Sequence, residues 1–393
     1  MEFRFSPQED TLRAEVRGFL RDTLPAEGVG TTVAPDGLTG SDEEWAFSLA
    51  FNKKLAEHGW IAPAWPSQYG GLDATYIEQL IFKEEFAYHR APDGGRVFGI
   101  DMLGPVLMVH GNDEQRARFL PRLTRGEDVW CQGFSEPGSG SDLASLRTTA
   151  EKDGDDYVVN GQKIWTTGAH RADWIFALAR TDQDAPKHKG ISFLMIDMKS
   201  PGVEVRPLIN MADSHEFNEV FFDNVRVPAT NRVGPENHGW YVAMTLLDFE
   251  RSNVGAVAAG RRTLEDLAVY MRETGMNGAA GKRAKQTMAD LQTGVEVGRM
   301  WAYRIASMQQ AGRVPNYEAS VAKVYNTELN QRIYNFAMNL LGPYAELAPG
   351  SKYEKLRGRL SKEYMENTAT TIYSGTSEIQ RNIIAQRGLG LPR

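Results

Sequence analysis

The chain has little cysteine and no long apolar run. Its only cysteine, Cys131, has no second thiol in the chain with which to form a disulfide. This suits a reducing compartment, because disulfides persist mainly in oxidising ones. No stretch approaches the roughly 18 consecutive apolar residues that a membrane-spanning helix needs. The start of the chain, Met1-Glu2-Phe3-Arg4, also lacks the apolar core of a signal peptide. We therefore expect a cytoplasmic protein that does not bind a membrane.

A sustained basic stretch is also absent. The chain has 44 basic and 51 acidic residues and a formal net charge of −7. The one basic cluster, Lys282, Arg283 and Lys285, is too short to suggest a nucleic acid as partner. Hydrophobic residues make up 41% and charged residues 24%, which is typical of a globular protein. With 393 residues, the chain is long enough for two or three packed units.

The first third of the chain shows helical patterns. Ser6-Pro7-Gln8-Glu9 is a capping box with proline at the first helical position, and Ser41 with Glu44 repeats the box. Further helices are expected over about 76–89 and 114–120, and Pro121 is expected to end the second of these.

The pattern changes near residue 125. Val158-Val159 lies between Asp153-Gly154 and Asn160-Gly161, two dipeptides that favour hairpin turns. Short apolar or alternating runs predict strands over 174–179, 191–196, 203–205 and 219–227. From Gly239 onward the period is helical again, over 240–272, 283–310, 317–341 and 353–373, with a loop at 275–281. The expected fold is mainly α with a middle β-domain. The predicted domains are 1–125 (all α), 126–236 (β) and 237–393 (a helix bundle).

Two segments of the β-region have the composition of a binding loop. Residues 131–142 read Cys-Gln-Gly-Phe-Ser-Glu-Pro-Gly-Ser-Gly-Ser-Asp. Glycines there allow close backbone approach, and the hydroxyls of Ser135, Ser139 and Ser141 can bind phosphate or the polar edge of a ring. In Lys163-Ile-Trp-Thr-Thr-Gly, Trp165 is an aromatic plane beside paired hydroxyls, which suits a planar ligand. A plain surface loop and a core tryptophan are the simpler alternatives.

A single carboxylate lies on an otherwise apolar helical face. Ala243, Leu247, Glu250, Val254 and Val257 are spaced by three or four residues and share that face. Burial of an unpaired carboxylate raises its pKa, so Glu250 is a candidate general base. A boundary glutamate paired with an arginine explains the pattern equally well.

Near the C-terminus, Gly375-Thr376-Ser377-Glu378 is typical of a capped helix start. Its backbone N–H groups are suited to bind an anion or a carbonyl oxygen. Helix capping alone is a sufficient explanation.

In this order and at these separations, the four segments resemble the acyl-CoA dehydrogenase family. Two further segments, 59–71 and 112–121, share the resemblance, which covers essentially the whole chain. It implies an N-terminal helical domain, a middle β-barrel-like domain and a C-terminal four-helix bundle, with FAD as cofactor and no metal. The implied reaction is α,β-desaturation of an acyl-CoA substrate to the trans-2-enoyl-CoA. Electrons then pass to a second protein such as electron-transfer flavoprotein. Homotetrameric or heterotetrameric assembly is also implied.

The resemblance also assigns roles residue by residue. Ser135 matches a hydroxyl at the flavin's pyrimidine edge, Trp165 a tryptophan beside the isoalloxazine, and Thr167 a donor near flavin N5. Ser141 matches a serine at the FAD pyrophosphate and borders the substrate site. The remaining cofactor-binding candidates are Gln132, Phe134, Thr376 and Glu378, and the remaining substrate-binding candidates are Asp248, Arg251, Tyr373 and Ser374.

The catalytic base departs from the commonest family pattern. Many relatives carry a glutamate directly after the tyrosine of the C-terminal motif, where this chain has Ser374. A smaller group, similar to the isovaleryl-CoA and long-chain dehydrogenases, places the glutamate on a bundle helix. Glu250 matches that second position, so the resemblance and the helical pattern indicate the same residue.

Two family motifs for the ADP half of FAD are missing. No Arg-Phe-Gly follows the first bundle helix, in the region 270–283, and Asn339-Leu-Leu-Gly-Pro343 stands where relatives have Gln-x-x-Gly-Gly. Lys282 or Arg283 is one candidate replacement for the arginine, and a different partner subunit is another.

Similar losses occur in a branch that resembles the steroid-degrading acyl-CoA dehydrogenases of actinobacteria. Segments 131–137, 216–223 and 388–393 look like that branch, which implies a bulky or cyclic acyl group. The alternatives are an acyl-CoA oxidase, which chain length disfavours, and a non-catalytic subunit that completes a partner's FAD site.

Overall fold

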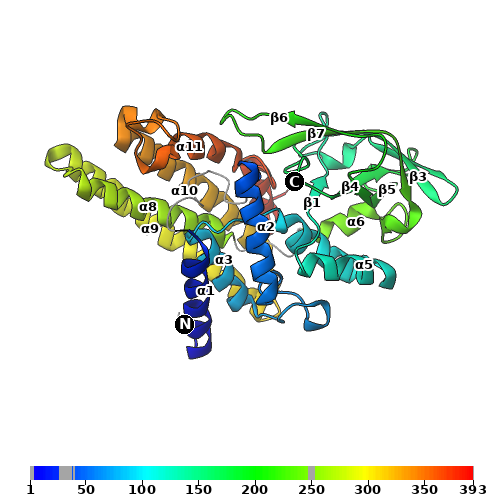
Figure 1. Ribbon diagram of the computed structural model, residues 1–393, viewed down its shortest axis with the longest axis horizontal. Coiled ribbons are helices and arrows are strands. Elements are labelled where there is room, and N and C mark those ends of the chain that lie inside the picture. Colours follow the sequence, from blue (N-terminus) through cyan, green and yellow to red (C-terminus); the bar gives the residue numbers. More distant parts are fainter. Residues whose placement is uncertain (1–3, 26–37, 39, 247–252, 393) are drawn as a thin grey trace. The chain divides into compact units, whose positions relative to one another are not determined.

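The computed structural model describes residues 4–25, 38, 40–246 and 253–392 (Figure 1). The chain divides into two compact units that interleave along the sequence. We call Met1–Pro35, Ala74–Pro92 and Arg251–Arg393 the helical unit, and Asp36–Asp73 with Asp93–Glu250 the sheet unit. Mainly helical structure with a β-sheet in mid-chain confirms the predicted fold class.

Long helices of the C-terminal region pack together in the helical unit. Its helices are α1 (Pro7–Thr23), α3 (Tyr76–Tyr88), α8 (Val254–Glu273), α9 (Gly278–Gln310), α10 (Tyr317–Leu341), α11 (Leu360–Ala369) and α12 (Ser377–Ile383). Helices α8, α9 and α10 contact one another, α11 and α12 pack on α10, and α3 packs on α8 and α9. The shared core includes Leu267, Val295 and Ile333, each fully buried. In the described part of the chain, no helix combines the length and apolarity needed to cross a membrane.

The sheet unit is built on one sheet, in which the described residues form eight strands. The strands are β1 (Trp130–Gly133), β2 (Thr149–Asp153), β3 (Asp156–Lys163), β4 (Trp174–Arg180), β5 (Ile191–Asp197), β6 (Val203–Leu208), β7 (Phe217–Pro228) and β8 (Arg232–Val233). Their order is β6-β7-β3-β2-β4-β5-β8, and β1 pairs with β4 in parallel. The unit's helices are α2 (Asp42–Glu57), α4 (Gly104–His110), α5 (Asp113–Thr124) and α6 (Gly239–Met244). Fully buried Cys131 belongs to the sheet's apolar core.

Local signals predicted several features correctly. Both capping boxes form, with Ser6 and Ser41 each accepting a hydrogen bond from the backbone N–H three residues later. Gly154 adopts φ +61° in the turn that joins β2 to β3, as its dipeptide indicated.

The predicted turn at Asn160-Gly161 is wrong. Both residues lie inside β3, and the pairing with β7 shifts register between Val159 and Gly161. This irregularity is a β-bulge. A Cβ at Gly161 would lie 2.5 Å from the Thr148 hydroxyl oxygen, so glycine is needed there for close packing.

Four predicted helices have different boundaries in the structure. The predicted helix over 240–272 is not continuous, because α6 ends at Met244 and α8 begins at Val254 after the left-handed Asn253. Helix α5 continues past Pro121 to Thr124, because burial of Leu120 and Leu123 stabilises its last turn. Helix α9 begins at Gly278, inside the predicted loop. The predicted helix over 353–373 is regular only over Leu360–Ala369. Arg357, at φ +61°, interrupts the segment before it.

Candidate functional site

The fold brings the two candidate binding segments of the sheet unit side by side. The Gly/Ser-rich segment, residues 134–142, follows β1, and the tryptophan segment, residues 164–168, follows β3. The backbone N–H of Ile164 donates to the carbonyl of Ser135 at 2.9 Å. Ser135 and Trp165, far apart in the sequence, therefore lie in adjoining stretches of backbone.

A buried ion pair fastens these segments together. Lys163 is fully buried, and its Nζ donates to Glu136 Oε1 and to the Leu178 carbonyl, both at 2.7 Å. The Glu136 carboxylate also accepts the backbone N–H groups of Arg147 at 2.6 Å and Thr148 at 2.9 Å. Buried charges persist when they are paired and hydrogen-bonded in this way.

Burial and mutual attraction have opposite effects on the pKa of each partner of this pair. Burial lowers the pKa of Lys163 to about 8, even though attraction to Glu136 opposes the shift. Burial tends to raise the pKa of Glu136, but attraction to Lys163 and the hydrogen bonds it accepts hold that pKa below its ordinary value.

Trp165 has an unusual backbone conformation and an exposed ring. Its φ is +60°, a left-handed value that is sterically unfavourable for a bulky residue, and its side chain is 55% exposed. The Phe217 ring lies nearly perpendicular to the indole, at a centroid distance of 5.8 Å and an interplanar angle of 84°. An exposed, oriented indole is suited to stacking on a planar ligand.

The hydroxyls around Trp165 fit a ligand with polar edges. Ser135 and Thr167 are half-buried, Ser141 is exposed, and within the described residues the Thr167 hydroxyl makes no hydrogen bond. The buried Ser139 hydroxyl likewise has no partner among them. A Cβ at Gly138 would meet no described atom within 4 Å, so the loop leaves open space. Together, open space, free hydroxyls and an exposed indole fit an isoalloxazine and its polar tail.

Two further candidates, Gln132 and Phe134, contact other parts of the sheet unit. Gln132 is half-buried, and its Nε2 lies 3.7 Å from the sulfur of Met102. Phe134 packs edge-on against Phe176 and Phe193, at centroid distances of 5.8 and 6.3 Å. Both side chains connect the Gly/Ser-rich segment to the unit's interior.

In the helical unit, the candidates form a tight turn before α12. Thr376 caps α12 by accepting the Ile379 N–H at 3.2 Å. Ser374 (φ +52°) and Gly375 (φ +85°) both have left-handed backbone. Gln380 Nε2 donates to the Ser374 carbonyl at 3.3 Å, and Lys323 Nζ donates to the Gly375 carbonyl at 2.7 Å. The turn is therefore fixed at both carbonyls.

This turn presents polar groups to its surroundings. Tyr373 and Ser374 are exposed, and the Ser374 N–H makes no hydrogen bond within the part of the chain that the structure describes. Glu378 is also exposed, and hydrogen bonds from its own backbone N–H and from the Thr376 hydroxyl lower the pKa of its carboxyl. An open backbone donor beside a fixed turn can bind a carbonyl oxygen.

Asp248, Glu250 and Arg251 lie outside the described residues. The described members of the predicted Glu250 face do not lie on one helix. Ala243 belongs to α6, whereas Val254 and Val257 belong to α8, which begins after Asn253 at φ +51°. All three are at most 3% exposed, but the single continuous face that the spacing predicted is wrong.

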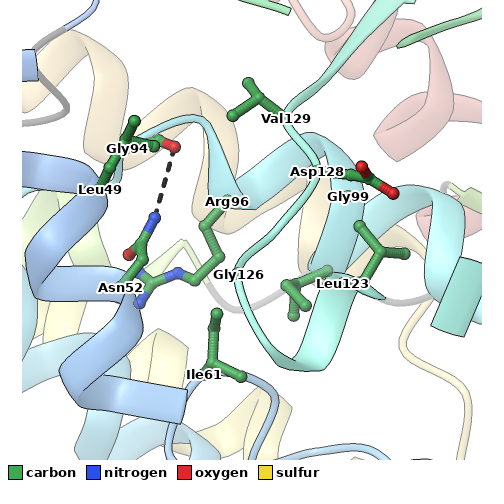
Figure 2. A pocket seen from close by; sticks show the side chains of 11 residues that line it. Leu49, Asn52, Ile61, Gly94, Arg96, Gly99, Leu123, Gly126, Asp128 and Val129 are labelled. Atoms are coloured by element: carbon green, nitrogen blue, oxygen red, sulfur yellow. Dashed lines mark hydrogen bonds between the residues drawn. The ribbon is translucent and has the colours of Figure 1, made fainter. Parts of the chain in front are cut away.

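A small pocket elsewhere in the sheet unit contains none of the candidates (Figure 2). It measures about 10 Å³, which is room for roughly one water molecule. Figure 2 shows the Asn52 amide donating to the Gly94 carbonyl, at 3.3 Å, beside Arg96. We assign this pocket to packing of α2 against the 93–103 segment.

Several site-forming residues were not predicted from the sequence. Glu136, Phe217 and Asn218 hold the tryptophan segment, and His170 and His215 surround Asn218. One usable signal was Lys163, a charged residue in the alternating pattern of a strand with a buried face. The partners of Asn218 gave no local signal.

Comparison with known proteins agrees with this geometry. The chain matches acyl-CoA dehydrogenase N-terminal, middle and C-terminal domains over residues 6–127, 131–225 and 237–389. It therefore belongs to the acyl-CoA dehydrogenase family, whose members are FAD-dependent oxidoreductases. This confirms the family, the class of enzyme and the cofactor that the sequence indicated.

Similar proteins include two from Mycobacterium tuberculosis. Acyl-CoA dehydrogenase IpdE1 is 39% identical and the alignment covers 98% of each chain. Acyl-CoA dehydrogenase FadE26 is 35% identical, over 100% of this chain and 99% of the relative.

Two solved structures also resemble the whole chain. The ChsE4-ChsE5 complex from M. tuberculosis has a chain 34% identical with a TM-score of 0.89, and a "Tcur3481-Tcur3483 steroid ACAD" has one 30% identical with a TM-score of 0.90. Both matches cover 100% of each chain.

Replacing Lys163 by methionine should lower the free energy of unfolding by about 3–5 kcal/mol, because Glu136 is left as an uncompensated buried charge. Urea denaturation measures this change. The double variant K163M/E136Q should lose less than the sum of its single variants. Lys199→Met is the matched control, since Lys199 is 80% exposed beside Asp173 and should contribute at most about 1 kcal/mol. Equal losses in both lysine variants would contradict the role of the ion pair.

His170 should make unfolding depend on pH in the acid range. Burial lowers its pKa to about 4, below the ordinary value of 6.5, so folding favours the neutral ring. Its contribution to stability is complete above pH 6.5 and is lost as pH falls through 4. The free energy of unfolding, measured by denaturant titration, should fall over that interval, and His170→Gln should flatten the decline. His58→Gln, at an exposed position of the same unit, serves as control; identical slopes for wild type and His170→Gln would refute the assignment.

Proposed function

We propose that this acyl-CoA dehydrogenase desaturates a CoA thioester with a bulky or cyclic acyl group and uses Glu250 as its base. The observation that carries the proposal is the joining of the Ser135 and Trp165 segments, which places an exposed indole beside free hydroxyls. The cofactor that fits this surface is the family's FAD, which accepts the β-hydrogen as hydride when bound.

The proposed FAD-binding residues have different chemical roles. Trp165 provides the stacking face, and the hydroxyls of Ser135 and Thr167 donate to the polar edge of the ring system. Ser141, in the open Gly/Ser-rich segment, suits the diphosphate. The remaining candidates are proposed as further contacts to FAD. They are Gln132 and Phe134, at and just after β1, and Thr376 and Glu378, at the start of α12.

Proton removal is assigned to Glu250. A serine hydroxyl is far too weak a base at neutral pH to replace a carboxylate, so Ser374 cannot serve. Its backbone N–H, however, is available to stabilise negative charge that develops on the thioester oxygen. The loss of a glutamate side chain at this position therefore leaves the backbone role intact. Asp248, Arg251, Tyr373 and Ser141 are proposed to line the substrate channel.

The proposals about the acyl group and about the oligomeric assembly are based on similar proteins. One solved relative, Tcur3481-Tcur3483, is a steroid ACAD, and that protein and ChsE4-ChsE5 each pair two differently named chains. The missing motifs for the ADP half of FAD suit a site completed by a second chain, in a homotetramer or heterotetramer. We also propose that electron-transfer flavoprotein is the electron acceptor and that the protein is cytoplasmic. The proposed domain boundaries lie after residues 125 and 236.

Glu250→Gln should keep FAD bound but reduce turnover by about 10²–10⁴-fold, the usual contribution of a positioned base. A dye-reduction assay with absorbance of the bound flavin separates the two effects. Glu273→Gln, at the exposed end of α8, is the matched control and should retain turnover. Near-normal turnover of Glu250→Gln would exclude Glu250 as the base.

Ring-bearing acyl-CoA thioesters should bleach the oxidised flavin band faster than straight-chain ones when added anaerobically to the purified protein. Stopped-flow absorbance measures the rates. Fastest bleaching by a short straight-chain thioester would contradict the bulky acyl group. Peroxide formation in air would indicate an oxidase. A colourless chain that does not retain added FAD would indicate a missing partner chain.

A further inference from the structure

Asn218 binds both backbone groups of Thr166. Asn218 is fully buried near the start of β7, and its carbonyl accepts the Thr166 N–H at 3.0 Å. Its side-chain Nδ2 donates to the Thr166 carbonyl, also at 3.0 Å. One step further, the Gly168 N–H donates to the Glu216 carbonyl at 2.9 Å. The tryptophan segment, although outside β3, therefore remains bonded to the start of β7.

Two histidines fix the orientation of the Asn218 amide. His215 Nε2 lies 2.8 Å from Oδ1, which can only accept, so His215 is the donor. His170 Nδ1 lies 3.1 Å from Nδ2, which can only donate, so the His170 proton is on Nε2, facing the Leu38 carbonyl at 3.1 Å. The two rings stack at 4.0 Å. Every polar group of the Asn218 side chain is therefore satisfied.

The neighbouring residue supports the indole itself. The Phe217 ring meets Trp165 edge-on, in the arrangement that aromatic pairs prefer. Consecutive residues of β7 thus hold the Trp165 ring and the peptide that follows it. This support is needed because the left-handed backbone at Trp165 persists only where its surroundings impose it.

We propose that Phe217 and Asn218 are positioning residues, which set the Trp165 ring and the Thr166-Thr167 backbone in the geometry that binds FAD. The inference rests on the proposed role of Trp165. It extends the binding site to a layer behind the residues that touch the cofactor. A ligand surface that is rigid before binding loses less conformational freedom when it is occupied.

The experiment compares Asn218→Ala, Phe217→Leu and Trp165→Phe by two measurements on the full chain. FAD is titrated into apoprotein to obtain its dissociation constant, and the fluorescence of bound FAD is recorded, because a stacked indole quenches flavin emission. Asn218→Ala should weaken FAD binding about tenfold, because among the side-chain hydrogen bonds that it removes, the one to the Thr166 carbonyl holds the tryptophan segment. All three variants should raise the emission of bound FAD. In a Trp165→Phe background, Asn218→Ala should add less to the emission than it does alone.

Asn160→Ala is the control, because Asn160 bonds β3 to Asn224 of β7 away from Trp165 and should change neither measurement. Unchanged emission in Trp165→Phe would remove Trp165 from the flavin and refute the proposed site. Raised emission in Trp165→Phe with wild-type values in Asn218→Ala and Phe217→Leu would overturn the positioning inference alone. Should Asn218→Ala not fold, His215→Phe keeps a stacked ring but loses the bond to Oδ1. It should raise emission to a lesser degree, and wild-type emission would again overturn the inference.

Discussion

The sheet side of the proposed site depends on the buried ion pair between Lys163 and Glu136. Each charge alone would be costly to remove from water, so burial of either one depends on its partner. Lys163 and Glu136 directly adjoin Ile164 and Ser135 in the sequence, and the backbones of Ile164 and Ser135 are hydrogen-bonded to each other. The ion pair therefore helps to hold the Gly/Ser-rich segment and the tryptophan segment in one arrangement. Binding residues on loops are precise when a rigid scaffold holds them in this way.

On that surface, Trp165 combines exposure with constraint. Its ring is exposed to solvent, whereas its backbone has a left-handed conformation that tryptophan rarely adopts. The start of β7 holds this backbone conformation, because Asn218 accepts the Thr166 N–H and donates to the Thr166 carbonyl. A strained backbone that is held by its neighbours is typical of a binding site that is formed before its ligand binds.

The turn before α12 follows the same logic in the helical unit. Lys323 and Gln380 donate to consecutive carbonyls and so fix the turn, in which the Ser374 N–H makes no hydrogen bond to any described residue. Because the turn is built from backbone geometry, it tolerates serine where many relatives have their catalytic glutamate. In this proposal the base has moved to another helix while the backbone donor has stayed in place.

The sequence by itself determined the order of helical and β-regions, the capped helix starts and the family. Those properties depend on local periodicity, on capping chemistry and on motifs that lie within short stretches. It erred at Asn160-Gly161 and at Pro121, where packing against Thr148 and burial of Leu123 outweigh the local preference. Only the tertiary structure decided that Glu136 meets Lys163 and that Asn218 meets Thr166. Such pairs join residues far apart in the chain, and their energies come from burial and hydrogen bonds that exist only after the sheet has formed.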